Sequence, residues 1–567
     1  MYSGNNIFGS SNQRKKIKNR TWTVMVIFIL FFCFLIWRIM NYMYFKSEPL
    51  KTMFNAQYTI DEPYGSQYRL TDCNGSELLE YEVKYFAVID PVDYLRFNEY
   101  TRKYDMQVLA ITLRNYNSDY DLKNIKGSGS FEKVKYKIDK ETYDKLKDIK
   151  GVKGFYTYIS NDVVKDNYWK IENILTDPRY YKDDKPEYKS ADSLEMQIYN
   201  KTKNNKFTKI RFAKGVNGEI AKGEIIKPKN NVNVKLTLDK AIEEKIEVIL
   251  HDEKLKKYSQ IGVVLMESST GKIRAMTQKN DNTYNANLGM PGTNGAVAGS
   301  IFKVIVDEAL LDKNLAYNDK MYTVDYKIFP GGHETFGKYT LAEALSYSSN
   351  NVFAQLGSEV GSETMYNYAE KQGMLGKVLN LHHEQSGKFE VDLFNPKVEV
   401  GDKSLTAIGQ KIRITPLEAI AIPNTIINNG IYVQPSIIDA YVNDKNEILE
   451  KIPVKTKTVL KTETAEVVKN HMMNVVEVGK GIGTQAYIKD MGIGGKTGTS
   501  TYYVKDKNGK DKKYSDGWFV GFFNLNGKNY SMVVFVPNID VDIKGKVDEE
   551  GGNTAAPIFK EVVNSLK

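Results

Sequence analysis

The sequence predicts an α+β fold in which an antiparallel sheet with helices on both faces follows a β-rich domain and one N-terminal transmembrane helix. Three observations predict it. An uncharged apolar run lies near the N-terminus, short alternating segments fill residues 45–235, and strand and helix patterns mix over 236–567. Because 567 residues exceed what one compact core holds, we expect these regions to fold as separate domains.

The apolar run at residues 21–37 carries no charge and, extended to residue 44, is long enough to span a bilayer. Five basic residues and no acidic residue precede it, so residues 1–20 are expected in the cytoplasm and the rest outside. A cleaved signal peptide and a lipoprotein are the alternatives. No small-x-small cleavage site follows the run, and Phe31 and Phe32 precede Cys33 where a lipobox needs small residues. We therefore expect a retained anchor at 21–44 in the cell membrane.

Charge and cysteine content bear on whether the protein binds nucleic acid, forms disulfides or holds a cysteine-rich metal site. The net charge of +9 is spread among 79 basic and 70 acidic residues without a basic stripe, which disfavours nucleic-acid binding. Cys33 lies in the apolar run and Cys73 stands alone outside it. The sequence therefore predicts neither a disulfide nor a cysteine-rich metal site.

Residues 45–235 alternate in short stretches, such as 81–89 and 209–226, which predicts strands and hairpins. The Asn74-Gly75 pair predicts a turn between two strands over 69–79, and residues 175–193 are expected to be extended and polar.

From residue 232 the pattern changes. We expect a strand at 232–238, a helix at 241–250, a hairpin at 261–276, and a second hairpin at 517–538 around Asn526-Gly527. Further helices are expected at 300–312, 340–357, 363–372, 462–478 and 557–567. Antiparallel strands at both ends with helices between them predict a sheet closed by its first and last segments.

The pattern Ser-x-x-Lys occurs at Ser130, Ser269 and Ser300. Only Ser300 opens an apolar helix, with Lys303 one turn later on the same face, where its amine can reach the serine hydroxyl. Ser is also a favoured helix N-cap, and Ser300 can serve both as cap and as nucleophile.

Two further patterns follow. Ser348 and Asn350 flank Ser349 at another helix start, where capping is again the alternative. Lys496-Thr497-Gly498-Thr499 occurs once, among small residues that let a ligand lie against the backbone.

In this order on an exported α+β domain, the three patterns resemble the signature set of penicillin-binding proteins and serine β-lactamases. Residues 232–567 resemble a penicillin-binding transpeptidase domain over nearly their whole length, including 407–422 and 517–523, and 45–235 resemble its pedestal domain more weakly. Two departures are Ala298 in place of a common Pro before Gly299, and Asp516-Gly517 before Trp518, where a His is common.

The resemblance implies a monofunctional, class B penicillin-binding protein, a serine-type peptidoglycan D,D-transpeptidase. Ser300 would attack the D-Ala-D-Ala carbonyl of a stem peptide, with Lys303 as its base in the neutral form. The amine of a second stem would resolve the acyl-enzyme, and β-lactams would acylate Ser300.

The other motif residues receive roles from the same resemblance. Ser348 would relay the proton to the leaving amine, and Asn350 would hold the substrate amide and Lys303. Lys496 and Thr497 would bind the substrate carboxylate, and Gly498 and Thr499 would also contact the substrate. The N–H groups of Ser300 and Thr499 would form the oxyanion hole.

The sequence disfavours three alternative functions. A class A β-lactamase needs a Glu ahead of a Leu-Asn pair, and Gly376 stands there before Leu379-Asn380. A membrane β-lactam sensor needs more cytoplasmic sequence than residues 1–20. A bifunctional synthase needs a glycosyltransferase motif, which is absent, so we expect a separate polytopic membrane glycosyltransferase as partner.

No cofactor is expected to be required. Some elongation-type relatives bind zinc between the first two motifs, where Asp325 and His333 lie. A polar loop without metal is the preferred interpretation.

Overall fold

The computed structural model describes residues 11–44, 57–126, 132–165, 168–317, 319–325, 337–395, 397–477, 479, 481–505, 509–540 and 551–567. Helix α1, Ser11–Tyr44, contains the apolar run. Its stretch Lys18–Met43 is long and apolar enough to cross a membrane, and it includes most of the expected anchor at 21–44.

The chain forms two compact units. The first comprises Met1–Gly65, Val83–Asp162 and Phe207–Pro228, and the second comprises Ser66–Glu82, Val163–Lys206 and Lys229–Lys567. The domain boundary predicted at residue 235 therefore lies close to Lys229, where the last segment of the second unit begins. Residues 66–82 and 163–206 lie within the range predicted for the pedestal domain, but they pack with the C-terminal unit.

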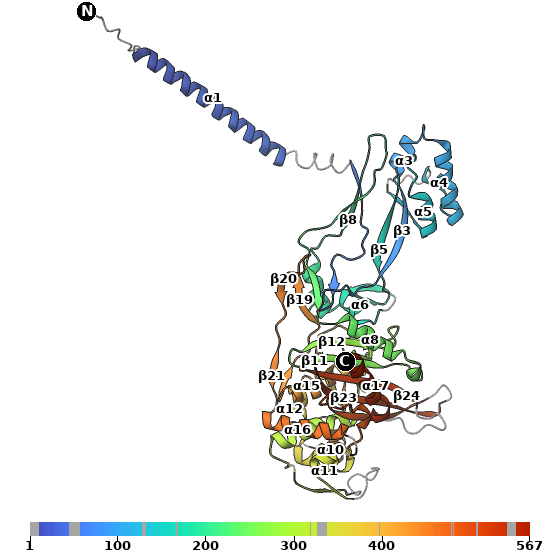
Figure 1. The fold of residues 1–567 in the computed structure, drawn as a ribbon, viewed down its shortest axis with the longest axis vertical. Helices are drawn as coiled ribbons and strands as arrows, with labels where there is room; N and C mark the ends of the chain where they lie inside the picture. The colour runs from blue at the N-terminus through green and yellow to red at the C-terminus, as the bar shows by residue number, and fades with distance from the viewer. Residues whose placement is uncertain are drawn as a thin grey trace, which may run out of the picture. The chain divides into compact units, whose positions relative to one another are not determined.

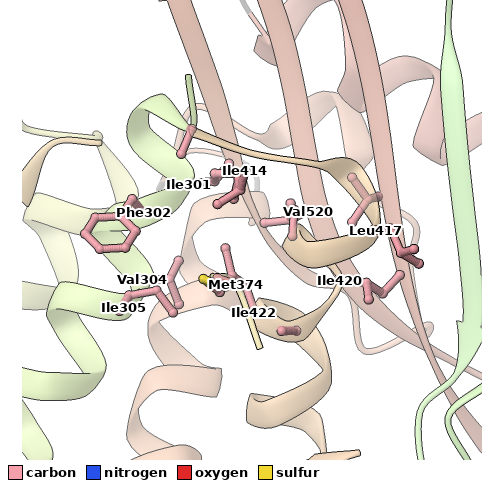
Figure 2. Close-up of a cluster of buried hydrophobic side chains, with 14 of the residues drawn as sticks. Ile301, Phe302, Val304, Ile305, Met374, Ile414, Leu417, Ile420, Ile422 and Val520 are labelled. Carbon is pink, nitrogen blue, oxygen red and sulfur yellow. The ribbon is translucent and has the colours of Figure 1, made fainter. Parts of the chain in front are cut away.

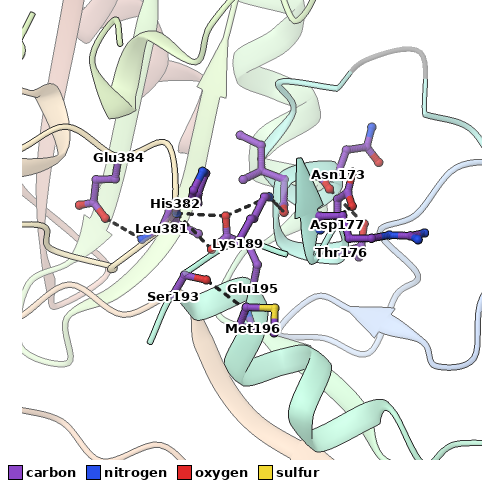
Figure 3. Close-up of polar contacts among 12 residues, drawn as sticks. Asn173, Thr176, Asp177, Lys189, Ser193, Glu195, Met196, Leu381, His382 and Glu384 are labelled. Carbon is purple, nitrogen blue, oxygen red and sulfur yellow. Dashed lines mark hydrogen bonds and ion pairs between the residues drawn. The ribbon is translucent and has the colours of Figure 1, made fainter. Parts of the chain in front are cut away.

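Buried polar contacts attach residues 163–206 to the second unit (Figure 3). The fully buried Lys189 amine contacts Glu195 at 3.1 Å, and the Glu195 carboxylate accepts the backbone N–H of His382 at 3.1 Å. The Asn380 side chain donates to the Asp192 carbonyl at 2.7 Å. Breaking such a buried pair leaves an uncompensated charge, so this segment is held firmly by the later loop.

The first unit contains two small three-stranded sheets and several helices. One sheet has the order β1-β8-β9 and the other β4-β3-β5. Its elements are β1 Tyr58–Asp61, β3 Tyr81–Ile89, α3 Pro91–Phe97, α4 Lys103–Tyr116, η1 Leu122–Lys126, β4 Val134–Ile138, α5 Lys140–Leu146, β5 Phe155–Val163, β8 Lys209–Ala213 and β9 Glu224–Ile226. Ile89, Leu109 and Leu146 are among the residues of its core.

The second unit is built on a five-stranded antiparallel sheet of order β12-β11-β24-β23-β22. These strands are β11 Gly262–Glu267, β12 Lys272–Gln278, β22 Gly494–Lys505, β23 Asp511–Leu525 and β24 Lys528–Asp540. Since early strand β11 pairs with late strand β24, the sheet is closed by segments from both ends of the domain, as predicted. Among the described strands, β22 lies at the edge of this sheet and pairs with β23.

Helices cover both faces of this sheet (Figure 1). Alternation along β23 sends Phe519 into a core with α8 Lys240–Leu250 and α17 Gly551–Leu566, and Val520 into the larger core on the other face. The larger core contains α9 Lys303–Asp312, α10 Leu341–Ser346, α11 Asn350–Val360, α12 Ser362–Lys371, α14 Pro416–Ala419, α15 Ala421–Ile427 and α16 Thr462–Val476. The predicted α+β class is confirmed.

The remaining elements of the second unit are short. They are β2 Leu70–Thr71, α6 Ile171–Thr176, β6 Arg179–Lys182, β7 Lys185–Tyr188, α7 Leu194–Thr202, β10 Asn233–Leu236, η2 Glu253–Leu255, η3 Ala286–Leu288, β13 Ala296–Val297, η4 Gly299–Phe302, β14 Tyr322–Thr323, β15 Lys338–Tyr339, β16 Lys388–Phe389, α13 Val400–Ala407, β17 Ile412–Ile414, β18 Ile431–Val433, β19 Ile438–Val442, β20 Ile448–Lys451, β21 Thr456–Thr458 and η5 Thr484–Ala486.

Three expectations for the elements need correction. The predicted helix over 340–357 is two helices, α10 and α11, broken at 347–349, where Ser348 adopts a φ of 56°. The polar stretch 175–193 contains the β6–β7 hairpin, which turns at Asp183-Asp184. Helix α17 begins at Gly551, six residues before the predicted start at 557, because Pro557 lies inside the helix rather than at its first turn.

The segment that follows Ser300 is anchored in the larger core (Figure 2). Ile301, Phe302, Val304 and Ile305 are fully buried, and Ile414 and Val520 belong to the same cluster. Completely burying such side chains stabilises by about 1.5–3 kcal/mol each, so η4 and α9 are held rigidly.

A buried ion pair joins α9 to α16. The His471 Nδ1 lies 2.8 Å from the Asp307 carboxylate. Burial alone lowers the pKa of His471, but attraction to Asp307 and their hydrogen bond outweigh burial and hold that pKa above its ordinary value. The pair therefore contributes stability that is fully present below the unfolded pKa of about 6.5 and is lost as pH rises through the folded pKa.

Replacing His471 by leucine is expected to lower the free energy of unfolding by about 3–5 kcal/mol at pH 6, because Asp307 is left buried without its partner. The difference in unfolding free energy between the parent and His471→Leu should shrink above the folded pKa of His471, because the parent's histidine is then neutral too. Denaturant unfolding between pH 6 and 9 measures it, and Asp307→Leu/His471→Leu is the matched control in which no charge remains. An equal loss at every pH would contradict the charge argument.

Candidate active site

Ser300 lies in the 3₁₀ turn η4, and α9 begins at Lys303. Neither helix start has a side-chain cap, so the capping alternative for Ser300 is wrong. Ser300 is half-buried, between the fully buried Gly299 and Ile301. Because no side chain caps η4 or α9, the Ser300 hydroxyl is not needed to start either helix.

Hydrogen bonds to three other segments fix the backbone before Ser300. The Ala298 N–H donates to the Ile412 carbonyl and the Gly299 N–H to the Gly409 carbonyl, both at 3.0 Å. The Trp518 indole N–H donates to the Val297 carbonyl at 3.1 Å. The region 407–416 thus supports Ser300 from behind, which the sequence patterns did not reveal.

Gly409 is expected to tolerate no side chain. Its φ is 80°, and a Cβ built there would lie 1.9 Å from the Gly299 carbonyl oxygen. Gly409→Ala should cost at least about 1–3 kcal/mol of stability from the strained backbone and displace Ser300, lowering its acylation rate.

The matched control is Gly401→Ala in helix α13, where a built Cβ meets nothing within 4 Å. Thermal unfolding and acylation by benzylpenicillin measure both variants. Equal stability and equal acylation rates in the two variants would contradict the close approach at Gly409.

Lys303 is fully buried, and its amine is surrounded by the loop between α10 and α11. The amine lies 2.6 Å from the Ser348 carbonyl oxygen, 3.2 Å from the Ser348 hydroxyl and 2.7 Å from the Asn350 Oδ1. The Lys303, Ser348 and Asn350 side chains predicted from separate patterns are therefore in direct contact.

The Ser348 backbone is held in a left-handed conformation, with φ of 56°. A neighbouring cap supports it: the Ser349 hydroxyl accepts the Val352 N–H at 3.1 Å and so begins α11. Non-glycine residues in this conformation cost about 1–3 kcal/mol and cluster at functional sites. Here the conformation turns the Ser348 carbonyl and hydroxyl toward Lys303.

Lys496 completes the group from strand β22. It is fully buried, and its amine lies 2.9 Å from the Ser348 hydroxyl and 3.0 Å from the Thr497 carbonyl. The Ser348 hydroxyl thus lies between two amines. This arrangement joins the two amines through one hydroxyl, along which a proton can pass.

The backbone of β22 passes directly beside Ser300. A Cβ built on Gly299 would lie 2.6 Å from the Thr499 carbonyl, and one built on Gly498 would lie 2.9 Å from the Ile301 side chain. On the other side, the Thr499 hydroxyl accepts the Gly551 N–H at 3.0 Å. Only glycines permit this approach, so Thr497, Gly498 and Thr499 run along the site.

The candidate zinc ligands do not form a site in the part of the chain that is described. Asp325 is exposed, and its backbone N–H and carbonyl bond with the Asn351 side chain at 2.7 and 2.6 Å. His333 lies outside the described residues. Within those residues, no group of three or more His, Cys, Asp or Glu side chains could hold a metal ion.

Sequence patterns did not identify Gly409 and Gly551 as part of the site. The signal available for Gly409 was the Ile-Gly-Gln segment within 407–416, already noted as resembling the family. No sequence motif marks Gly551. Because the helix was predicted to begin at 557, the contact of Gly551 with β22 could not be predicted.

Comparison with known proteins identifies the family of the domain. A family model described as "Penicillin binding protein transpeptidase domain" matches residues 261–564. Stage V sporulation protein D of Bacillus subtilis is 24% identical, with 97% of this chain and 86% of that protein covered. Penicillin-binding protein PbpB of Mycolicibacterium smegmatis is 26% identical over 54% of this chain and 50% of its own length.

Solved structures share the fold. A peptidoglycan synthetase from Bifidobacterium adolescentis has a TM-score of 0.61 at 18% identity, covering 90% of this chain and 96% of that chain. Penicillin-binding protein 3 of Mycobacterium tuberculosis, complexed with aztreonam, has a TM-score of 0.58 at 16% identity, with the same coverage. With the transpeptidase model matching more than half of its length, this chain belongs to the penicillin-binding protein transpeptidase family.

Proposed function

We propose that the protein is a serine-type peptidoglycan D,D-transpeptidase that cross-links stem peptides and is acylated by β-lactams. The observation that carries the proposal is the buried group in which the Lys303 and Lys496 amines both contact the Ser348 hydroxyl, with Ser300 in the turn η4 that leads directly into Lys303. Relatives named peptidoglycan D,D-transpeptidase, such as PenA of Neisseria meningitidis at 25% identity, support it.

In the first half-reaction, the Ser300 oxygen attacks the carbonyl between the two terminal D-Ala residues. Its proton passes to the neutral Lys303 amine, and the N–H groups of Ser300 and Thr499 stabilise the oxyanion. The C–N bond then breaks, an ester forms on Ser300, and the departing D-Ala amine receives its proton through the Ser348 hydroxyl.

Lys496 and Thr497 hold the carboxylate of the departing D-Ala, and Asn350 orients the substrate amide and Lys303. In the second half-reaction, an amine of a second stem attacks the ester. The new amide is the cross-link, and Ser300 recovers its proton.

A hydrolase of β-lactams is disfavoured. The Leu379-Asn380 pair lacks a preceding Glu, and the Asn380 side chain instead donates to the Asp192 carbonyl. This chain therefore lacks the Glu that, in a class A β-lactamase, would activate the water that hydrolyses the acyl-enzyme.

Helix α1 is proposed as the membrane anchor, with residues 1–20 in the cytoplasm and the catalytic unit outside. The basic residues before the apolar run support this orientation. Since a transpeptidase needs polymerised glycan, we infer a separate polytopic membrane glycosyltransferase as partner. We propose that no cofactor is required, and metal analysis of the purified protein tests Asp325 and His333 as zinc ligands.

Product analysis tests the proposed reaction. Full-length protein in detergent is mixed with a D-Ala-D-Ala-ending stem peptide and a labelled D-amino acid as acceptor. We expect D-Ala release together with a peptide that carries the labelled residue. If the only peptide product is the stem peptide shortened by one D-Ala, without the labelled residue, the protein is a carboxypeptidase instead.

A further inference from the structure

Asn351 is a fully buried residue that directly follows Asn350 at the start of α11. Its Oδ1 accepts the Asp325 backbone N–H at 2.7 Å, and its Nδ2 donates to the Asp325 carbonyl at 2.6 Å. The three sequence motifs do not include Asn351. Because the Ser349 hydroxyl already caps α11, these contacts are not needed to begin the helix.

Strand β14 and the residue that follows it are anchored in the larger core. Tyr322 and Val324 are buried among its apolar side chains. Gln355, one turn after Asn351 on α11, adds a second link to this segment. Its Nε2 donates to the Thr323 carbonyl at 2.9 Å and to the Asn351 Oδ1 at 2.8 Å. The first turn of α11 is therefore tied to a segment that the core holds in place.

Strand β14 also closes a frame around the loop that carries Ser348. It pairs with β15, which leads directly into the capped start of α10 at Thr340. Helix α10 ends at Ser346, the loop 347–349 follows, and α11 returns to the β14 segment through Asn351. Because left-handed non-glycine residues persist only where the surrounding structure fixes them, this frame accounts for the Ser348 conformation.

Asn350 and Asn351 point to different sides of α11, since successive residues of a helix are about 100° apart. The Asn350 Oδ1 lies 2.7 Å from the Lys303 amine, whereas the Asn351 side chain contacts Asp325. The first turn of α11 is thus held between the proposed base and the β14 segment. A shift of this turn would move Asn350 and Ser348 away from Lys303 together.

We propose that Asn351 is a positioning residue for the acylation step. By pairing with the Asp325 backbone, it fixes the first turn of α11 and so holds Ser348 and Asn350 around the Lys303 amine. The effect of Asn351 on the rate therefore passes through these neighbours. The inference rests on the proposed function and deepens it, because it names a residue outside the three motifs on which acylation depends.

Stopped-flow acylation of the full-length protein by benzylpenicillin tests this role. In Asn351→Ala, the limiting acylation rate should fall about 10- to 100-fold, because misplacing catalytic groups by about 1 Å costs up to about 10²-fold. The benzylpenicillin concentration at half of this rate should change by less than about twofold, since Lys496 and Thr497 hold the carboxylate from β22. A purely structural role would lower the amount of protein that reacts but not the limiting rate.

Asn424→Ala is the matched control. Asn424 is equally buried on α15 and also bonds two backbone groups, with its Nδ2 3.0 Å from the Ser268 carbonyl oxygen and its Oδ1 2.8 Å from the Val433 nitrogen. The control should lose comparable thermal stability and react at the parental limiting rate. Equal slowing in Asn424→Ala and Asn351→Ala would assign the effect to stability and overturn the proposal.

Combination with Asn350→Ala shows whether Asn351 acts through its neighbour. Adding Asn351→Ala to Asn350→Ala should slow acylation by a smaller factor than in the parent, because residues that act as one unit are not additive. The same factor in both backgrounds would refute the positioning role.

Gln355→Ala decides the question if Asn351→Ala shows no thermal unfolding transition, since it removes only the second link to β14. Slowing of at least about twofold in Gln355→Ala supports the positioning role, and the parental limiting rate excludes it.

The parental protein separates this inference from the proposed function. If benzylpenicillin acylates Ser300 in the parent and Asn351→Ala reacts at the parental limiting rate, the positioning role is refuted alone. If benzylpenicillin leaves Ser300 unmodified in the parent, the proposed function fails and the inference fails with it.

Discussion

Replacing Ser300 by alanine is expected to abolish acylation by benzylpenicillin and the release of D-Ala. No other nucleophile lies on η4 beside the Lys303–Ser348–Lys496 group, and removing a serine nucleophile from such a unit costs about 10⁶-fold in rate. Intact-mass spectrometry of the protein before and after benzylpenicillin measures the adduct.

Ser269→Ala is the matched control for this result. Ser269 begins another Ser-x-x-Lys match, but it is exposed in the turn between β11 and β12. The control should form the adduct at the parental rate. An adduct that persists in Ser300→Ala would contradict the assignment of the nucleophile.

Replacing Lys303 by methionine should slow acylation by about 10²- to 10⁴-fold, the usual contribution of a general base. Methionine fills the apolar part of the lysine's space but cannot accept the Ser300 proton. It also leaves the Asn350 Oδ1 and the Ser348 carbonyl without the amine that they contact. Stopped-flow acylation and thermal unfolding, measured together, separate the lost base from lost stability.

Lys272→Met is the corresponding control. Lys272 ends the Ser269-x-x-Lys match and forms a half-buried ion pair with Asp439 at 2.6 Å. It should acylate at the parental rate. A Lys303→Met protein that folds and acylates as fast as the control would exclude Lys303 as the base.

The sequence predicted which residues come together in the site. It did not predict the backbone conformation that positions them. Lys303, Ser348, Asn350 and Lys496 come from three separate patterns, and the structure places their side chains in contact. The left-handed backbone at Ser348 was not predictable, because the helical pattern continues through it and only tertiary contacts impose the break.

The limits of the fold prediction have the same origin. Alternation predicted β11, β12, β23 and β24 of the main sheet, since it reports which face is buried, but not the edge strand β22. Assignment of residues 163–206 to the second unit depends on buried pairs such as Lys189–Glu195, and on contacts with residues 380–382, almost 200 positions later. No local pattern carries such information.

The most direct test of the central claim is a timed measurement of the benzylpenicillin adduct on the full-length protein, followed by peptide mapping. A transpeptidase that excludes water should keep the adduct for many minutes on the peptide containing Ser300 and lose it faster when an acceptor amine is added. Rapid loss to water, or an adduct on any other peptide, would contradict the account.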